Sequence, residues 1–274
     1  MNGPILSIIT VNFNNNLGLL KTLESVSSQS FSSYEHIIID AGSTDGSRET
    51  IIQYEKENPH LSFWSSESDK GIYDGMNKGI DHAKGQYLYF LNSGDCLSQD
   101  ILAKIPFDGT EYLYGDTILF YKRKTKKRVL DLIYLSDNSL HHQSCFIHHT
   151  LFKDKRYDIN YKIISDWAHC FQCLIIENRT YRHLPYIISE CDGRGISSNG
   201  KELNQERTLW FQNTFPATQS KVFIDCAALD RSGFRDIIHI LANTHKFKKR
   251  MKTLILFLYK INNLFSYKHK RIKN

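Results

Sequence analysis

The first hundred residues switch repeatedly between short, continuously apolar runs and longer amphipathic segments. The apolar runs are rich in β-branched residues, which favours strands that are buried on both faces of a sheet. The amphipathic segments place apolar side chains three and four positions apart, as in helices that pack on a sheet. The predicted strands are 5–11, 36–40, 61–65 and 86–91, and the predicted helices are 17–26, 48–57 and 72–83. Strands that alternate with helices at this spacing predict a mainly parallel α/β sheet.

Beyond residue 95 the pattern is less regular. Residues 111–121 and 127–133 resemble two strands joined by a basic turn, and residues 165–177 have helical periodicity. The pattern also predicts short strands within 181–191, a polar glycine-rich loop at 193–200 and a helix with a basic face at 234–265. No internal repeat is present. We therefore predict one domain of two halves, residues 1–100 and 101–230, followed by a helical basic extension at 231–274.

Composition and charge narrow the class of protein. Of the 274 residues, 41% are hydrophobic and 23% are charged, so the chain can form the core of one large domain. Residues 246–274 carry ten Lys and Arg and no acidic residue, which leaves 25 basic against 29 acidic residues in the rest of the chain. Because a nucleic-acid-binding domain should carry a basic face on its folded part, we expect no nucleic acid partner.

The basic C-terminal segment also contains apolar residues at three- and four-residue spacing. A helix with this pattern has an apolar stripe flanked by Lys and Arg, which is typical of helices that lie in a membrane interface. Each basic residue near an anionic surface adds about 1 kcal/mol of attraction. We therefore predict peripheral contact with the inner face of the cell membrane. The alternative is that the stripe packs against the folded domain or a second subunit.

The six cysteines are scattered through a chain whose N-terminus lacks the positively charged region of a secretory signal. They are expected to be reduced thiols in a cytoplasmic protein. Cys170 and Cys173 form a C-x-x-C pair, but no second pair follows at zinc spacing, so core packing is the better interpretation. The sequence has no run of about 18 apolar residues that could span a membrane.

Polar and acidic residues follow each of the four predicted strands. These are Thr10, Val11 and Asn12 after the first strand, residues 40–46 after the second, 66–71 after the third and 92–95 after the fourth. In an open parallel sheet, ligands bind beyond the carboxyl ends of the strands, so these residues should converge on one rim. Carboxylates on one rim favour a divalent cation with a phosphorylated ligand, and glycines allow the backbone to approach that ligand closely.

Several ordered motifs carry a resemblance to a known family. SIITVNFNN, IIIDAGSTDGS and ESDKGIYDGMNKGIDHAKGQYLYFLNSGD occur in this order up to residue 95, and HHQS, YKIISDW and GRGIS follow at 141–144, 161–167 and 193–197. Together they resemble the family 2 inverting glycosyltransferases, in the branch that builds bacterial surface polysaccharides. The resemblance implies a GT-A fold, a nucleoside-diphosphate sugar donor (a UDP-sugar is expected) and Mg²⁺ or Mn²⁺ as the cofactor.

The resemblance also implies roles for individual residues on the donor side. The matching donor-binding residues are Thr10, Val11 and Asn12 for the base and ribose, Asp40 for a hydrogen bond from the base, Asp69 and Lys70 for the ribose and diphosphate, and Asn92. Asp95 matches the retained aspartate of the metal motif. Asn92 and Gly94 depart from the family, which usually has acidic residues there. Mg²⁺ often binds through one or two carboxylates plus substrate phosphates, so Asp95 can be a sufficient anchor.

The acceptor side requires a base. An inverting transfer is a single displacement at the anomeric carbon, so the acceptor hydroxyl must lose its proton as it attacks, and a carboxylate can accept that proton. Asp166 matches the family's base-bearing block. It is also a favourable residue for a helix N-terminus, and the two roles are compatible. Trp167 is expected either to stack on an acceptor sugar or to pack in the core. His142 and Gln143 either contact the diphosphate or acceptor or are polar loop residues.

We therefore predict a glycosyltransferase that acts at the cytoplasmic face of the membrane. It would move a sugar from a nucleoside-diphosphate sugar to a hydroxyl of a lipid-linked or saccharide acceptor, in lipopolysaccharide or capsule biosynthesis. Residues 1–100 would bind the donor and residues 101–230 the acceptor. A nucleotidyltransferase is one alternative, disfavoured because G-x-x-x-x-G-K-[ST] and G-x-G-x-x-G are absent. The other alternative is a nucleotide-sugar-binding module without catalysis. It stays possible because Asn92 and Gly94 replace residues that are usually acidic in the family.

Overall fold

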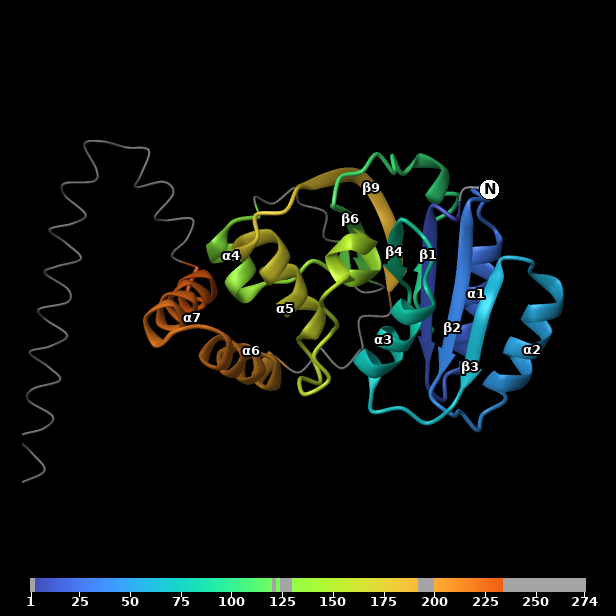
Figure 1. Cartoon of the computed structure of the whole chain (residues 1–274), viewed down its shortest axis with the longest axis horizontal. Coiled ribbons are helices and arrows are strands. Elements are labelled where there is room, and N and C mark those ends of the chain that lie inside the picture. Colours follow the sequence, from blue (N-terminus) through green and yellow to red (C-terminus); the bar gives the residue numbers. More distant parts are fainter. Residues whose placement is uncertain (1–2, 120–121, 124–129, 192–199, 234–274) are drawn as a thin grey trace, which may run out of the picture.

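The computed structural model of the chain describes residues 3–119, 122–123, 130–191 and 200–233. In this part of the chain one sheet of nine strands runs through the molecule in the order β3-β2-β1-β4-β8-β6-β9-β5, with β7 paired to β6. Helices pack beside the N-terminal half of the sheet, and α6 and α7 gather beyond its other half (Figure 1). This mixed α/β architecture confirms the predicted fold class.

The four N-terminal strands are parallel and alternate with three helices, as predicted. The strands are β1 (Leu6–Asn12), β2 (Tyr34–Asp40), β3 (Leu61–Ser66) and β4 (Tyr87–Phe90), and the helices are α1 (Asn16–Ser27), α2 (Ser47–Glu57) and α3 (Ile72–His82). β1 lies between β2 and β4, with Leu6 opposite Tyr34 on one side and Tyr87 on the other. All residues of β1, β2 and β4 are buried, which explains why their sequences are largely apolar rather than alternating.

Different helices cover the two faces of this parallel half. In β1 and β2, odd-numbered residues such as Ile9 and Ile39 pack with Met76 of α3. Even-numbered residues point to the opposite face, where Ile38 packs with Leu19 of α1. The pleat of the sheet therefore decides which polar side chains of these strands are buried under α1 and α2.

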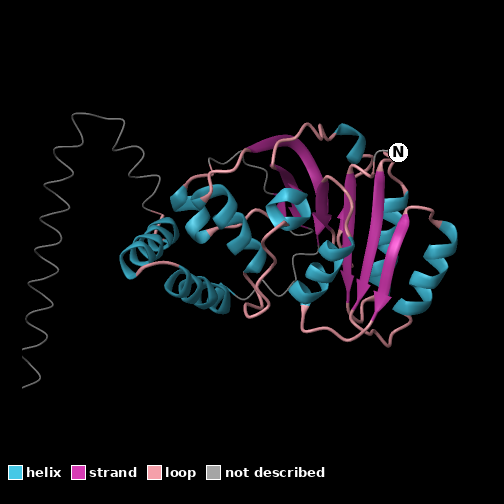
Figure 2. Ribbon diagram, in the orientation of Figure 1, coloured by secondary structure: helices cyan, strands magenta, loops and turns pink. Residues whose placement is uncertain are grey.

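The C-terminal half continues the sheet with strands in both directions (Figure 2). Its strands are β5 (Cys96–Leu97), β6 (Tyr112–Leu119), β7 (Lys122–Arg123), β8 (Cys145–His148) and β9 (Tyr181–Cys191). Its helical segments are η1 (Leu102–Lys104), α4 (Leu132–Asp137), η2 (His142–Ser144), η3 (His149–Phe152), α5 (Ser165–Phe171), the π-helical η4 (Gln172–Ile176), α6 (Gly200–Thr214) and α7 (Ala217–Arg231). β8 is antiparallel to both β4 and β6, whereas β9 is parallel to β6.

The predictions for the C-terminal half are confirmed in part. The helix predicted at 165–177 forms α5 and η4, and 181–191 forms one long strand. The strand predicted at 127–133 is wrong over its described part, because α4 begins at Leu132 after the N-cap Asp131, whose side chain accepts a hydrogen bond from the N–H of Tyr134. The partner of β6 in the hairpin is instead β7. Apart from Gly200, the predicted loop at 193–200 lies outside the described residues, as does the predicted helix at 234–265.

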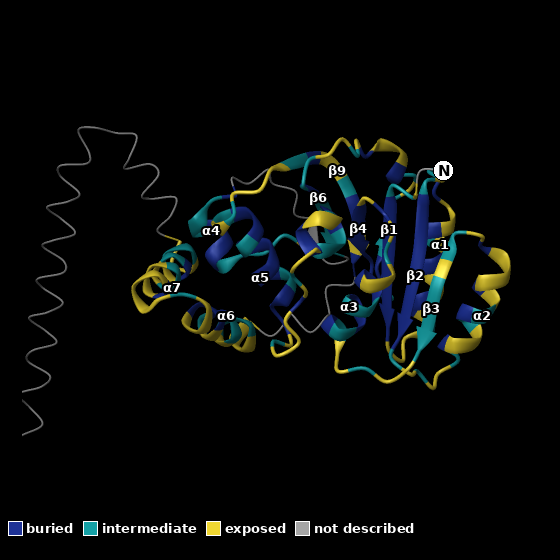
Figure 3. Ribbon diagram, in the orientation of Figure 1, coloured by how far each residue is buried: buried dark blue, intermediate teal, exposed yellow. Residues whose placement is uncertain are grey.

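Residues 200–231 form α6 and α7, which the sequence pattern does not predict. Few of their residues are buried (Figure 3), so their sequences carry a weak amphipathic signal. Trp210 and Phe211 of α6 pack on Trp167 and Phe171 of α5. This aromatic cluster attaches α6 to α5. Within the described ranges, no helix has the length and apolar character needed to cross a bilayer.

Candidate active site

Polar side chains from both halves meet where the parallel strands end. Asn12 and Asp40 are the last residues of β1 and β2, and Asn92 follows β4 by two residues. From the C-terminal half, His142 of η2 and Asp166 in the first turn of α5 reach the same rim. The rim therefore joins residues that the motifs assign to the donor with residues that they assign to the acceptor.

Asp40 holds the loop that follows β2. Its carboxylate is fully buried. One oxygen accepts hydrogen bonds from Asn12 Nδ2 at 2.7 Å and Ser43 Oγ at 2.5 Å, and the other from Ser43 N at 2.9 Å and Ser66 Oγ at 2.6 Å. Burial acts to raise its pKa, but these hydrogen bonds outweigh burial and hold the pKa below its ordinary value. Direct contact between Asp40 and the base of the nucleotide stays a prediction. Such a contact requires the base to replace one of these four hydrogen-bond donors.

The side chain of Thr10 is buried in the core, so a contribution of this residue to the base and ribose pocket stays a prediction. It lies on the face of β1 that α1 and α2 cover and is fully buried. Its hydroxyl lies 2.9 Å from His36 Nε2, and His36 Nδ1 lies 3.0 Å from the hydroxyl of Tyr54 in α2. Val11 points the other way, toward α3, and is 9% exposed. Asn12 is 4% exposed, and its Nδ2 donates to Asp40 Oδ1 at 2.7 Å and to Ser43 Oγ at 3.2 Å.

Asp69 and Lys70 lie on the loop between β3 and α3. Asp69 Oδ1 accepts a hydrogen bond from Gly71 N at 2.9 Å, and the N–H of Lys70 donates to Asp74 at 3.1 Å. Gly71 has φ +116°, a backbone conformation that favours glycine. The Lys70 residue is exposed, so its ammonium can reach an anionic ligand. Asp69 and Asp74 therefore fix the main chain of the loop, while the Lys70 side chain is exposed.

Asp95 and Gln143 form a direct bridge between the two halves. Gln143 Nε2 donates to Asp95 Oδ2 at 2.9 Å, and the Thr22 hydroxyl of α1 donates to the main-chain oxygen of Asp95 at 2.7 Å. Asp95 is 9% exposed. Gln143 therefore orients the carboxylate that the sequence assigns to the metal.

Asn92, His142, Asp166 and Tyr73 form a line of hydrogen bonds across the rim. Asn92 Nδ2 lies 3.0 Å from His142 Nε2, and His142 Nδ1 lies 3.0 Å from Asp166 Oδ2. Because an amide NH₂ can only donate, Nε2 accepts and the Nδ1–H donates to the carboxylate. Asp166 Oδ1 accepts hydrogen bonds from the Tyr73 hydroxyl and the Trp167 N–H, both at 2.8 Å. In the described part of the chain Oδ2 accepts one hydrogen bond, from His142, and so keeps a lone pair for a ligand.

Asp166 is held in its charged form. Desolvation acts to raise its pKa, but donation from His142 and Tyr73 outweighs it and leaves the pKa below its ordinary value. The opposite holds for Tyr73, whose pKa is raised well above its ordinary value by burial and by the charge of Asp166, so its hydroxyl stays protonated and donates. The Asp166 side chain is 18% exposed, and a ligand can therefore reach it.

Trp167 packs in the core, which is the second of the two roles expected for it. It is 2% exposed, and its indole N–H donates to the main-chain oxygen of Leu135 at 2.7 Å. The rings of Trp210 and Phe211 lie 5.2 and 5.3 Å from its ring. No face of the indole is free for a sugar.

The rim offers a carboxylate and an amide oxygen, which could hold a divalent cation only together with further ligands such as a diphosphate. Among the described residues, no group of three or more His, Cys, Asp or Glu could hold a metal ion. Asp95 and Asn92 belong to one tight turn, in which Asp95 N donates to the main-chain oxygen of Asn92 at 3.0 Å. The side-chain oxygen of Asn92 is buried and has no hydrogen-bond partner within the described residues. A carboxylate and a free amide oxygen are ligands suited to Mg²⁺ or Mn²⁺.

Sequence reasoning missed two residues of the rim. Tyr73 lies within the GIYDGMNKGI motif, and nothing in a single sequence shows that its hydroxyl reaches Asp166. Phe13 follows Asn12 directly and is 64% exposed. The sequence shows that an aromatic residue follows Asn12, but the continuously apolar pattern of β1 does not show that its ring stays exposed.

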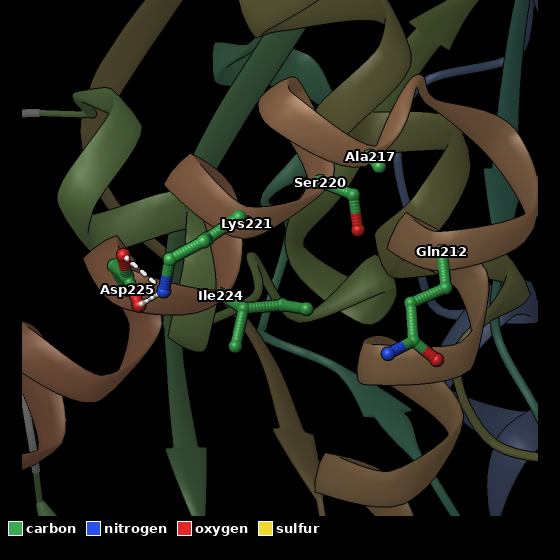
Figure 4. A pocket seen from close by; sticks show the side chains of 6 residues that line it. All are labelled: Gln212, Ala217, Ser220, Lys221, Ile224 and Asp225. Carbon is green, nitrogen blue, oxygen red and sulfur yellow. Dashed lines mark hydrogen bonds and ion pairs between the residues drawn. The ribbon is translucent and has the colours of Figure 1, made fainter.

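A separate hollow of about 390 Å³ lies between α6 and α7 (Figure 4). Its lining residues are Gln212, Ala217, Ser220, Lys221, Ile224 and Asp225. Lys221 Nζ lies 3.3 Å from Asp225 Oδ2, but both side chains are exposed, so the pair contributes little to stability. The hollow contains none of the rim residues, and we assign it no role.

Solved structures define the class to which this architecture belongs. S. aureus TarS 1-349, solved in complex with UDP, has a TM-score of 0.63 and 15% identity, over 87% of this chain and 75% of that chain. The mannosyltransferase PcManGT from Pyrobaculum calidifontis, in complex with GDP-Man and Mn²⁺, has a TM-score of 0.60 and 14% identity, over 97% of this chain and 84% of that chain. At such identities the likeness shows the fold alone. The fold is GT-A, as predicted.

The sequence profile of glycosyl transferase family 2 matches residues 7–171, which is more than half of the chain. The chain belongs to this family. A PGL/p-HBAD biosynthesis glycosyltransferase of Mycobacterium bovis BCG is 28% identical over 211 residues, or 73% of this chain and 81% of that protein. Two uncharacterized glycosyltransferases of Mycobacterium tuberculosis are 42% identical over 103 residues, or 37% of this chain. The match spans 38% of the length of these two relatives.

Proposed function

We propose that the protein is an inverting glycosyltransferase that moves a sugar from a nucleoside-diphosphate sugar to an acceptor hydroxyl. The observation that carries this proposal is the position of Asp166. Within the described residues its Oδ2 accepts a hydrogen bond from His142 alone and so keeps a lone pair, and His142 connects it to Asn92 just after β4. A candidate base therefore lies at the same strand ends where an open α/β sheet binds its ligand.

The donor would bind along the ends of β1 and β2. The exposed ring of Phe13 would stack on the base, and the loop fastened by Asp40 would form the wall of the pocket. Lys70 would offset the negative charge of the diphosphate. Asp95 and Asn92 would hold a divalent cation, which supplies positive charge to the leaving diphosphate.

Transfer would proceed by a single displacement. The acceptor oxygen forms a bond to the anomeric carbon on the face opposite the diphosphate, while the bond from that carbon to the diphosphate oxygen breaks and its electron pair leaves with the diphosphate. Asp166 Oδ2 accepts the hydroxyl proton through its free lone pair. His142 and Tyr73 fix the carboxylate by donating to its two oxygens. The lowered pKa keeps Asp166 ionised before the proton arrives.

We further propose a UDP-sugar as the donor and a lipid-linked or saccharide acceptor in surface-polysaccharide biosynthesis. The presence of UDP in the TarS structure supports the donor, and the name of the PGL/p-HBAD relative supports a biosynthetic role. The ten Lys and Arg of residues 246–274 support contact with the inner face of the membrane, where a lipid-linked acceptor would lie. A cytoplasmic, peripheral location follows from this proposal.

One observation favours a second candidate, nucleotide-sugar binding without transfer. The rim offers Asp95 and an amide where the family usually has further acidic residues. The two functions differ in the fate of the donor, because a binding module leaves the sugar nucleotide intact.

The test is turnover of UDP-GlcNAc, UDP-glucose, UDP-galactose and GDP-mannose by the full chain with Mn²⁺, followed by the variant Asp166→Asn. We expect release of nucleoside diphosphate from at least one donor, and a ~10²–10⁴-fold loss in Asp166→Asn, the usual contribution of a general base. UDP binding measured by calorimetry should be near normal. Asp154→Asn, an exposed aspartate of the same half, is the matched control. Equal single-turnover rates for wild type and Asp166→Asn would refute the base assignment, and intact donors with tight binding would favour the binding module.

A further inference from the structure

The helix that carries Asp166 has no side-chain cap of its own. α5 has seven residues and begins at Ser165, and its N-cap residue Ile164 offers no side-chain acceptor to the first turn. Free N–H groups at a helix start are usually satisfied by such a side chain. In this turn Asp166 Oδ1 itself accepts the N–H of Trp167, and contacts from elsewhere in the protein fix the residues on either side of Asp166.

Glu206 of α6 fixes the segment just before Asp166. Its Oε1 accepts the N–H of Lys162 at 3.0 Å, and its Oε2 accepts the N–H of Ile163 at 2.9 Å. The main-chain oxygen of Ile163 lies 2.8 Å from the hydroxyl of Tyr73, which also lies 2.8 Å from Asp166 Oδ1. Ile163 is thus fixed through its N–H by Glu206, and its C=O shares the single hydroxyl proton of Tyr73 with Asp166 Oδ1. Hydrogen bonds to a charged acceptor are about twice as strong as neutral ones, which makes Glu206 an effective anchor.

The same helix fixes the residue just after Asp166. The ring of Trp210 lies 5.2 Å from the ring of Trp167 in an edge-to-face contact, and the guanidinium of Arg207 lies 4.9 Å from the centre of the Trp167 ring. Glu206 and Trp210 are four residues apart, so they lie on the same face of α6. One face of α6 therefore contacts the chain on both sides of Asp166. α6 lies beyond residue 171, where the family profile ends.

We propose that α6 is a clamp on Asp166, the proposed general base, and that Glu206 is the positioning residue of this clamp. The inference rests on the proposed function, in which Asp166 accepts the acceptor proton. Glu206 acts through the main chain of Lys162 and Ile163 and sets where Asp166 Oδ2 lies relative to the attacking hydroxyl. Misplacement of a reacting group by about 1 Å can lower a rate by about 100-fold. Loss of the clamp should therefore slow the chemical step and leave donor binding unchanged.

The experiment compares Glu206→Ala and Glu206→Gln in the full chain, using the donor from the panel above on which the wild type is active. We expect Glu206→Ala to lower kcat by ~10–100-fold, with the KM for the donor within about twofold of wild type. Glu206→Gln retains one acceptor oxygen, so its kcat should lie between those of wild type and Glu206→Ala. Glu202→Gln removes a charge from an exposed residue one turn earlier on α6 and should match wild type.

The decisive readout is a double-mutant cycle with Asp166→Asn. If Glu206 acts through Asp166, then Glu206→Ala should lower the rate of the Asp166→Asn variant by less than about threefold, because the group that it positions is already lost. An undiminished effect in that background, or an unchanged kcat in Glu206→Ala, would overturn the clamp. If Glu206→Ala does not fold, Glu206→Gln carries the same cycle. A wild-type rate in Asp166→Asn alone would instead refute the proposed base, so the two failures are distinguishable.

Discussion

His142 Nδ1 lies 3.0 Å from Asp166 Oδ2, while the other nitrogen of the same ring lies 3.0 Å from the side-chain amide of Asn92. This imidazole joins the donor-side turn after β4 to the first turn of α5. The pairing gives Asn92 a role that an aspartate could not fill, because a carboxylate cannot donate a hydrogen bond to a neutral imidazole nitrogen. The departure of this chain from the acidic metal motif therefore has a structural counterpart in His142.

The first prediction concerns the loss of this donor. His142→Leu removes a hydrogen bond that helps to hold the pKa of Asp166 down, so that pKa should rise. The acid limb of the kcat/KM profile should move to higher pH, and kcat should fall by about tenfold through poorer positioning of the carboxylate. The measurement is the pH dependence of donor turnover. His149→Leu, an exposed histidine on η3, should leave the profile in place, and an unmoved acid limb in His142→Leu would contradict the link.

The second prediction concerns the metal. Asp95→Ala removes the rim carboxylate that Gln143 orients, so Mn²⁺ should no longer strengthen the binding of UDP. Calorimetry of UDP with and without Mn²⁺ measures the effect directly. Gln143→Leu keeps the carboxylate but removes the hydrogen bond that orients it. We expect the affinity for Mn²⁺ to fall by ~10–100-fold, so that Mn²⁺ still strengthens UDP binding, but less than in wild type. Strictly Mn²⁺-dependent binding by Asp95→Ala would place the metal elsewhere.

The third prediction concerns the base of the nucleotide. Stacking of a base on an aromatic side chain is worth about 1–3 kcal/mol by alanine substitution. Phe13→Ala should therefore weaken UDP binding by ~5–150-fold. Leu17→Ala removes an apolar side chain of α1 that is even more exposed, at 77%, and this variant should bind UDP like wild type. Equal affinities for the Phe13→Ala and Leu17→Ala variants would exclude a stacking role for Phe13.

The fourth prediction concerns stability and pH. Asp40→Asn replaces an acceptor of four hydrogen bonds with a group that must point an NH₂ at some of the same donors, so the free energy of unfolding should fall by about 1–3 kcal/mol at pH 7. The folded-state pKa of Asp40 is below its unfolded value of about 3.9. Its ionisation therefore stabilises the fold fully above that value, and the stabilisation is lost as the pH falls toward the folded-state pKa. Urea denaturation at pH 7 and at pH 3 should show the difference between wild type and variant shrinking at low pH. A constant difference would contradict the assignment.

The sequence determined the parallel half of the fold almost completely. Strands buried on both faces must be continuously apolar, and helices that cover them must be amphipathic. Local patterns therefore predict β1 to β4 and α1 to α3, and the predicted boundaries lie within about two residues of the observed ones. The positions of Asp40, Asn92 and Asp95 at strand ends follow from the same patterns. α6 and α7 were missed because few of their side chains are buried, which leaves little periodicity to detect.

The tertiary structure alone decided which of these residues work together. Thr10 and Asn12 are two positions apart and point to the same side of β1, yet Thr10 is enclosed against His36 whereas Asn12 reaches Asp40 at the rim. Trp167 follows Asp166 directly, but the helix turns its ring into the aromatic core. The contacts among Tyr73, His142 and Asp166, and the clamp by Glu206, join segments that are far apart in the chain. Local propensity encodes the elements, whereas such distant pairings depend on how the elements pack, and no pattern within one segment specifies them.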